Sequence, residues 1–371
     1  MTQVVFKPIP RPADYLTKGE TTRLNLGLRP LILLLLGAAL AGVLLLSLAV
    51  GSVSIPVEQI ITVLLGGEAE RASWSNIILK VRLPKALTAM LAGAALGVSG
   101  LIMQTFFRNP LAEPFVLGIS SGASLGVALV VLSAGTVGGV LLAGFGLTGD
   151  LLLAGAAALG AAAALIVVLS ISLRVRSSLT LLIVGLMMGY LTSALVSLML
   201  FFAIPERIQA YINWTFGSFA SVTWEQLPIL AGAVTSGLAI ALAMTKPLNS
   251  LLLGEEYARS LGLNLMWTRL RLVSVTAILA GAVTAFCGPI GFIGVAAPHL
   301  CRSLFHTSDH RMLVPGSILM GALIALIAAL VAEVPGRNLV LPLNAVTALI
   351  GAPVVIAVIL RRRNLHQSFG S

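Results

Sequence analysis

Charged residues are scarce in this chain. Only 10% of its 371 residues are Asp, Glu, Lys or Arg, while 58% are hydrophobic and the mean hydropathy is +1.04. A soluble domain is roughly 25% charged, so this chain has too little polar surface to face water on all sides. The composition excludes an ordinary soluble protein and predicts an all-α, polytopic membrane protein.

Cysteine and catalytic motifs are also scarce or missing. Cys287 and Cys301 are too few for a disulfide framework and are expected to be small buried side chains. No Lys follows a Gly, which rules out a phosphate-binding loop for ATP, and there is no H-E-x-x-H motif. We expect no catalytic residue, no metal site and no cofactor bound by this chain. His306, Asp309 and His310, which could be pictured as metal ligands, are interpreted as a solvated turn.

Long apolar runs take the place of charge. A helix needs about 20 apolar residues to cross the hydrocarbon of a bilayer. The plain candidates are Leu31–Val50, Ala86–Phe107, Leu151–Leu173, Leu179–Ala203, Leu227–Thr245, Met312–Ala332 and Leu341–Leu360. Two further uncharged stretches, Phe115–Gly149 and Leu272–Cys301, are too long for one span and need another criterion.

The positions of Lys and Arg supply that criterion, because these residues concentrate in cytoplasmic loops. If Arg108 and Arg174 both lie inside, an even number of spans separates them. Phe115–Gly149 therefore holds one span and a loop, and Leu151–Leu173 is the return span. With Arg271 and Arg302 both inside, Leu272–Cys301 is a hairpin that turns near Gly288–Pro289. The chain is therefore expected to have about ten transmembrane helices, with both termini cytoplasmic.

This topology divides the chain into three parts. Residues 1–30 are a polar cytoplasmic tail, since the apolar run that follows is longer than that of a cleavable signal. Residues 31–363 form the transmembrane domain, with a cytoplasmic loop at about 247–268, and residues 364–371 form a cytoplasmic C-terminal tail. The net charge of +10 is explained by Lys and Arg residues that concentrate in the cytoplasmic loops, next to membrane lipid. We therefore expect no nucleic acid partner.

Small residues recur within the spans at intervals of four. Examples are Gly93 and Gly97, Gly118, Gly122 and Gly126, and Gly185 and Gly189. Such residues align on one helix face and let two backbones approach closely. Packing within one subunit is the first interpretation, and a lining of a transport path is the alternative.

None of the expected spans has Asp, Glu, Lys or Arg in its interior. Ion-coupled carriers depend on buried ionisable groups, and membrane enzymes need ligands or bases. The sequence therefore favours a transporter that takes its energy from a partner. An ion-coupled secondary carrier is the alternative from another class.

One charged island interrupts the apolar pattern, at Gly254–Leu265, "GEEYARSLGLNL". Glu255 and Arg259 have the spacing of an ion pair on a short helix. Gly262 is expected to end this helix and Asn264 to cap a second short one, so that two helices are joined at Gly262.

The same island has an apolar stripe, Tyr257, Ala258 and Leu261, on the other face from the acid–base pair Glu255 and Arg259. An apolar stripe with a charged rim is typical of a protein docking surface. The alternative is an amphipathic helix that lies on lipid.

Several stretches together resemble one family. The segment "LLLGEEYARSLGLNL" is similar to the coupling loop of permease subunits of ABC importers for iron-siderophores, haem and vitamin B12 (FecCD-like, type II importers). The same family pattern occurs in Arg82–Gly126, in "FCGPIGFIGVAAPHLCR", Phe286–Arg302, and in "LPLNAVTALIGAPVVIAVILRRR", Leu341–Arg363. The resemblance covers most of residues 80–363, in family order.

The resemblance implies a ten-span permease in the bacterial inner membrane that moves its solute by alternating access. Its implied partners are a second permease, identical or related, two cytoplasmic ATPases that carry ATP and Mg, and a periplasmic binding protein. An iron-siderophore is the expected solute, with haem or cobalamin as alternatives. The residues implied in ATPase coupling are Glu255, Glu256, Tyr257, Arg259, Leu261 and Gly262.

The resemblance also implies two gates and a docking surface. Asn109 and Leu111 match one cytoplasmic gate turn, and Ser178 and Leu179 match the other; ordinary loops are the alternative. The basic residues that match contacts to the binding protein are Arg82, Lys85 and Arg337, and contact with lipid headgroups is the alternative. The family often has Arg where this chain has Glu333. Either Arg337, four residues later, takes over that contact, or the charges of the partner differ here.

Overall fold

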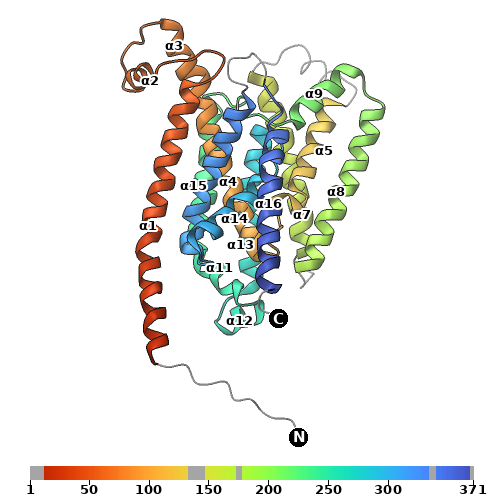
Figure 1. Cartoon of the computed structure of the whole chain (residues 1–371). Coiled ribbons are helices and arrows are strands. Elements are labelled where there is room, and N and C mark those ends of the chain that lie inside the picture. The colour runs from red at the N-terminus through yellow and green to blue at the C-terminus, as the bar shows by residue number, and fades with distance from the viewer. Residues whose placement is uncertain (1–11, 133–146, 173–177, 334–339, 368–371) are drawn as a thin grey trace.

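A computed structural model describes residues 12–132, 147–172, 178–333 and 340–367, and the long helices run side by side as one bundle (Figure 1). The helices are α1 (Pro12–Ala49), α2 (Val57–Leu64), α3 (Ala72–Asn76), η1 (Ile77–Arg82), α4 (Leu83–Phe106), η2 (Pro114–Leu117), α5 (Ile119–Val131), α7 (Leu147–Ser172), α8 (Ser178–Phe201), α9 (Pro205–Thr215), α10 (Leu227–Ala243), α11 (Thr245–Leu252), α12 (Glu255–Ser260), α13 (Leu265–Cys287), α14 (Ile293–Phe305), α15 (His310–Ala332) and α16 (Leu343–Gln367). The end of the bundle at α11 and α12 is called the inner end, and the opposite end, at α9, the outer end.

The all-α, membrane-spanning fold is confirmed. Within the described ranges, six helices are long and apolar enough to cross a bilayer, or seven if α10 and α11, bent by 54°, are one span. The helix α5 and the apolar part of α16 are shorter. The number of ten spans and the cytoplasmic position of both termini remain predictions.

The two uncharged stretches that were hard to divide have different outcomes. Leu272–Cys301 breaks between Cys287 and Ile293, where the hairpin turn was predicted, because Gly288 has a φ of +76° and begins the turn. The helix before this turn starts at Leu265, so it is longer than predicted. Phe115–Gly149 contains α5 and then residues 133–146, which lie outside the described ranges.

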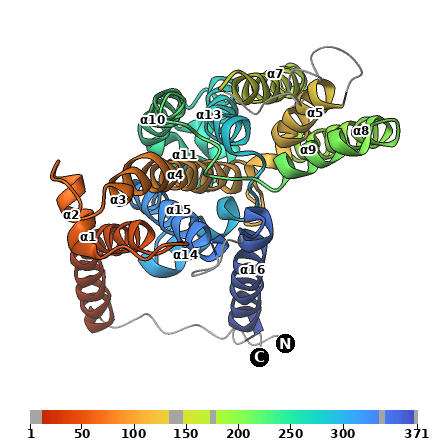
Figure 2. The ribbon, with the colours of Figure 1, turned by 90° about the horizontal axis from the view of Figure 1, so that it is seen from above.

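The helix α4 is the centre of the bundle, as the view along the helices shows (Figure 2). It lies in a span of which 83% of the apolar window is buried, against 17% for α1 and 22% for α8. Its glycines explain this position. A Cβ atom at Gly93 would lie 2.2 Å from the carbonyl oxygen of Gly321 in α15, and one at Gly100 would lie 1.8 Å from that of Gly294 in α14.

The same close packing joins α5 to α7. A Cβ atom at Gly122 would lie 2.4 Å from the Gly160 carbonyl oxygen, and one at Gly126 would lie 2.1 Å from that of Ala156. Packing within one subunit is therefore confirmed for these glycine repeats. Gly189 is different, because a Cβ atom there would meet only the Ser121 Oγ, at 3.4 Å.

Candidate functional site

The charged island folds at the inner end with the caps that its sequence predicts. Gly254, with a φ of +115°, starts α12, and Gly262, with a φ of +83°, ends it. The amide of Leu263 donates to the Ala258 carbonyl at 3.1 Å, which is the long hydrogen bond of a Schellman ending. The Asn264 side chain accepts a hydrogen bond from the Trp267 amide and caps the next helix.

The arrangement of the short helices was predicted wrongly. The helix that Asn264 caps is α13 itself, which runs on into the membrane, so no second short helix follows Gly262. The two short helices are α11 and α12, joined at Gly254. The preceding span, α10, ends at the turn at Met244, and Pro247 lies in the first turn of α11, where proline is tolerated.

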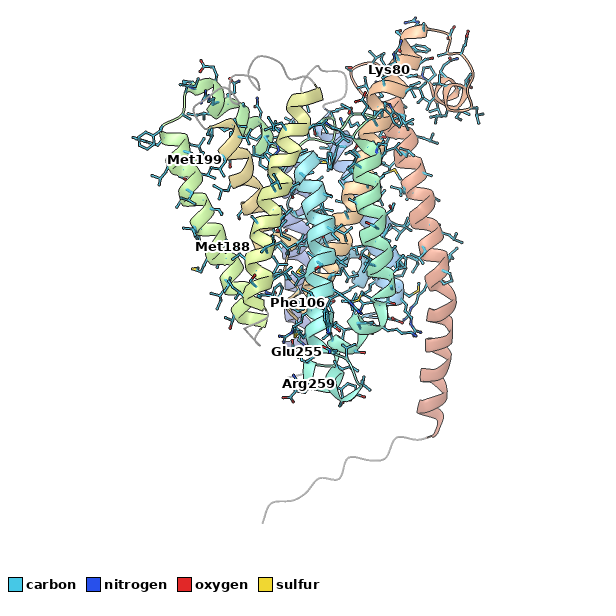
Figure 3. The ribbon with its side chains drawn as sticks, turned by 180° about the vertical axis from the view of Figure 1, so that it is seen from behind. Lys80, Phe106, Met188, Met199, Glu255 and Arg259 are labelled. Carbon is cyan, nitrogen blue, oxygen red and sulfur yellow. The ribbon has the colours of Figure 1, made fainter. Side chains whose placement is uncertain are left out.

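Glu255 does not pair with Arg259, as the helix spacing predicted. Its Oε2 lies 2.6 Å from an Nη of Arg269, on the first turns of α13. An ion pair between two helices fixes their relative position, whereas a pair within α12 would only stabilise that helix. Glu255 therefore holds the island against the root of a membrane span, and Arg259 stays exposed at the inner end (Figure 3).

The inner end carries a group of exposed apolar side chains, here called the coupling patch: Leu253, Tyr257, Leu261, Met266 and Trp267. Each of these side chains is more than half exposed. Ala258, expected in the same stripe, is instead fully buried and anchors α12. Contiguous exposed apolar surface with a charged rim marks an interaction site on a protein.

The first predicted gate turn lies directly beside the island. The Asn109 side chain accepts a hydrogen bond from the Leu111 amide at 3.0 Å, so it turns the chain as expected, and Leu111 is exposed. An Nη of Arg108, a residue with a φ of +49°, donates to the Leu252 carbonyl at 3.2 Å at the end of α11. His299 bonds the Pro110 carbonyl through its Nε2 at 2.8 Å. The turn is thus tied both to α11, the helix just before the island, and to α14.

A second link, between α11 and the bundle, was not predicted. Asn249 of α11 accepts hydrogen bonds through its Oδ1 from the amide and the Nδ1 of His310, at 2.9 and 2.8 Å. An amide oxygen can only accept, so Nδ1 carries the proton, and in the neutral ring Nε2 is an acceptor. Nε2 lies 2.8 Å from the Thr105 Oγ1 of α4, whose hydroxyl also lies 2.9 Å from the Leu101 carbonyl. His310 is fully buried, so it is not part of a solvated turn.

Asp309 completes this cluster. It caps α15 by accepting from the Arg311 amide at 2.9 Å, and it also accepts from the Asn249 amide nitrogen at 2.6 Å. Partial burial acts to raise the pKa of Asp309, but these two hydrogen bonds and the charge of Arg311 outweigh it and hold the pKa below its ordinary value. The only local signal for the cluster was an Asp before a helix start.

Removing the Asn249 side chain should loosen this link. Asn249→Ala takes three hydrogen bonds from His310 and Asp309 and leaves a buried imidazole N–H without its partner, which costs about 1–3 kcal/mol. We expect a lower thermal unfolding midpoint in detergent and fewer solute molecules moved per ATP hydrolysed. Ser250→Ala, in the same helix but bonded only to the Lys246 carbonyl, is the control. An unchanged midpoint and an unchanged ratio would contradict the assigned role.

The second predicted gate turn is described only in part. Ser178 is the first residue of α8, and residues 173–177 lie outside the described ranges, as do the side chains of Ser178 and Leu179. The gate role of these two residues stays a prediction. Among the residues described, no group of three or more His, Cys, Asp and Glu side chains is placed to hold a metal ion.

At the outer end the predicted docking residues have internal partners. Arg82 is buried and donates to the backbone carbonyls of Leu48, at 2.6 Å, and Val53, so it braces the end of α1. Lys85 of α4 forms an ion pair with Glu333 at the end of α15. This contact between the two helices explains why the chain has an acidic residue at position 333. Arg337 lies outside the described residues. The docking role of all three stays a prediction.

One acidic residue lies deeper than the sequence suggested. Glu113, expected in a cytoplasmic turn, is half-buried, and its Oε1 accepts a hydrogen bond from the Phe292 amide at 3.1 Å, just before α14. Gln104 likewise accepts from Arg302 of α14. The Glu113 contact fastens the segment between α4 and α5 to the start of α14, and the Gln104 contact fastens the end of α4 to the same helix. Nothing in the local sequence indicated either contact.

Comparisons with known proteins agree on one kind of protein. The FecCD transport family matches residues 28–361. The "Vitamin B12 import system permease protein BtuC" of Citrobacter koseri is 37% identical over 285 residues, which are 76% of this chain and 83% of that protein. The protein of the same name from Salmonella newport is 37% identical over 283 residues, with the same coverage.

A solved structure is also similar. It is described as "An inward-facing conformation of a putative metal-chelate type ABC transporter", and it aligns with a TM-score of 0.77 and 31% sequence identity. The alignment covers 90% of this chain and 99% of that chain. The family match over residues 28–361 includes the coupling patch, the first gate turn and the outer end alike.

Proposed function

Because this chain belongs to the FecCD transport family, we propose that it moves an iron-siderophore across the bacterial inner membrane. It is the membrane-spanning permease subunit of an ABC importer and not an enzyme, and the ATPase is a separate subunit. The observation that carries the proposal of a permease coupled to an ATPase is the inner end, where the coupling patch is exposed and α11, the helix before the island, is hydrogen-bonded to the predicted gate turn.

The contacts of the island suggest how it transmits movement. One of two ATPase subunits, which bind ATP and Mg, docks on the coupling patch of this chain and pushes α11 and α12 when the two ATPases close. The Arg108–Leu252 hydrogen bond passes this push to the turn at Asn109 and Leu111. The Asn249–His310 contact passes it to α15 and, through Thr105, to the end of α4. A displacement of the turn opens or closes the inner gate.

A second permease, identical or related, completes the pathway in this proposal. The helix α8 has a face available for this contact, because only 22% of its apolar window is buried within the subunit. A periplasmic binding protein delivers the solute at the outer end, where Lys85 contacts it after exchanging its Glu333 partner. Electrostatic contacts of this kind set orientation and association rate more than affinity.

A corrinoid is the second candidate solute. Two of the relatives above are named as vitamin B12 import permeases, at 37% identity. Both candidates are bulky metal chelates whose metal is shielded by an organic shell. The same transport cycle serves either, so the choice depends on the chemistry of the pathway.

Reconstitution tests the proposal. The chain, its ATPase and its binding protein are placed in proteoliposomes, and uptake of a radioactive ferric tri-hydroxamate siderophore and of radioactive cyanocobalamin is measured. We expect uptake of one chelate that requires ATP, with a complex containing an ATPase-dead partner as the control. Uptake by this chain alone, driven by an ion gradient, would show a secondary carrier instead.

A further inference from the structure

The outer half of the subunit contains a cavity of about 360 Å³ between α5, α8 and α9. Its lining is rich in hydroxyl groups and includes no acidic or basic residue. The hydroxyl-bearing residues are Ser120, Ser121 and Ser124 of α5, Thr192, Ser193 and Ser197 of α8, and Tyr211 of α9. Figure 3 places the stretch of α8 between Met188 and Met199, which carries three of them, toward the end of the bundle opposite Arg259.

The helix periods explain why these hydroxyls meet. Gly189, Thr192, Ser193, Val196 and Ser197 recur at intervals of three and four on one face of α8. That face lies opposite the serines of α5, and Gly189 leaves room for the Ser121 Oγ. Polar side chains in a membrane span face the bundle interior or a water-filled cavity.

The hydroxyls are not all used by the protein. Thr192 donates to the Met188 carbonyl at 2.9 Å, and Tyr211 shares a side-chain hydrogen bond with Ser124. In the part of the chain that the structure describes, Ser121, Ser193 and Ser197 make no hydrogen bond to protein, and Ser193 and Ser197 are exposed where the cavity opens. These hydroxyls can donate to, and accept from, a molecule in the cavity.

We propose that this cavity, here called the hydroxyl pocket, binds the uncharged, oxygen-rich edge of the transported chelate. The inference rests on the proposed function and names the chemistry of its solute. Amide, hydroxamate and hydroxyl groups find both donors and acceptors in the pocket. A carboxylate would lose its hydration with no opposite charge to replace it, so a charged edge is disfavoured. At about 360 Å³ the pocket takes part of a bulky chelate, and the rest lies toward the open side at Ser193 and Ser197.

The experiment measures binding of three chelates to the purified complex of permease and ATPase by equilibrium dialysis. The probes are cyanocobalamin, which has an edge of amides, a ferric tri-hydroxamate siderophore, and haem, whose edge is apolar apart from two carboxylates. We expect wild type to bind at least one of the first two more tightly than haem. The triple variant Ser121→Ala, Ser193→Ala and Ser197→Ala should weaken that binding about tenfold and leave haem unchanged.

Two further variants separate chemistry from packing. Gly189→Leu places a side chain in the pocket without removing a hydroxyl and should weaken the same chelate. Ser170→Ala with Ser236→Ala, on exposed faces of α7 and α10 where each serine bonds its own helix, should change nothing. Equal affinity of the triple variant and wild type, or equal loss for all three chelates, would overturn the inference. If wild type shows ATP-driven uptake but the triple variant binds the chelate as tightly as wild type, only the hydroxyl pocket is overturned. If uptake by wild type does not depend on ATP, the proposed function is overturned.

Discussion

Leu261→Glu should abolish ATP-driven uptake while the permease remains folded. Leu261 is 59% exposed in the coupling patch, next to Tyr257, so the substitution costs little in the isolated chain. When an ATPase covers this patch, a carboxylate there is buried without a partner, which costs about 2–5 kcal/mol of binding. We expect co-purification of the ATPase to fall more than about tenfold, and uptake in proteoliposomes to fall with it.

Two companion variants show whether the patch is the reason. Ser260→Ala, on the same short helix, removes only a hydrogen bond to the Tyr257 carbonyl and should retain wild-type uptake. Glu256→Lys with Arg259→Glu reverses the exposed rim charges and should have a weaker effect, since exposed pairs contribute about 0–1 kcal/mol. Full ATPase binding by the Leu261→Glu variant would mean that the partner docks elsewhere.

Gly100→Val should prevent stable folding. A Cβ atom at this position would lie 1.8 Å from the Gly294 carbonyl oxygen, so α4 and α14 would have to separate. The three atoms nearest to this Cβ all belong to the backbone of Gly294, which cannot rotate away as a side chain would. We expect a cost of about 3 kcal/mol or more, at the upper end for overpacking. Thermal unfolding in detergent, followed by size-exclusion chromatography, measures the loss.

Gly232→Val is the matched control for this substitution. Gly232 lies inside α10, and a Cβ atom there would have nothing within 4 Å. Both changes replace a glycine by the same β-branched residue inside a helix, so they share the same change in helix propensity. A similar fall in the unfolding midpoint for both variants would show that propensity, and not the α4–α14 contact, limits stability.

Local patterns explain what could be predicted about this inner end. A glycine that needs a positive φ, as Gly262 does, or an Asn that caps its own helix, as Asn264 does, acts within a few residues. The Asn109 turn belongs to the same class. The predicted pairing of Glu255 with Arg259 was wrong because Arg269 of α13 is a second possible partner. Which arginine Glu255 meets depends on how α12 packs against α13.

Contacts between distant residues could not be predicted in this way. Thr105 and His310 are 205 residues apart, and Lys85 and Glu333 are 248 apart. Their side chains meet only because α4 packs backbone to backbone against α15 at Gly93 and Gly321. The hydroxyl pocket likewise requires α5, α8 and α9 to converge, although each serine by itself is an ordinary helix residue.

The sequence by itself determined that the chain is a helical membrane protein with a charged island. The hydrocarbon core of the bilayer excludes charge and contains no water to hydrogen-bond unpaired backbone groups, so the spans must be apolar and helical. It also determined the caps of the island, since these depend on neighbouring residues. The tertiary structure decided which polar groups became partners and which hydroxyls stayed available. In a membrane, helices associate through shape and hydrogen bonds and not through a hydrophobic difference, so the fit of complete helix faces selects the pairs.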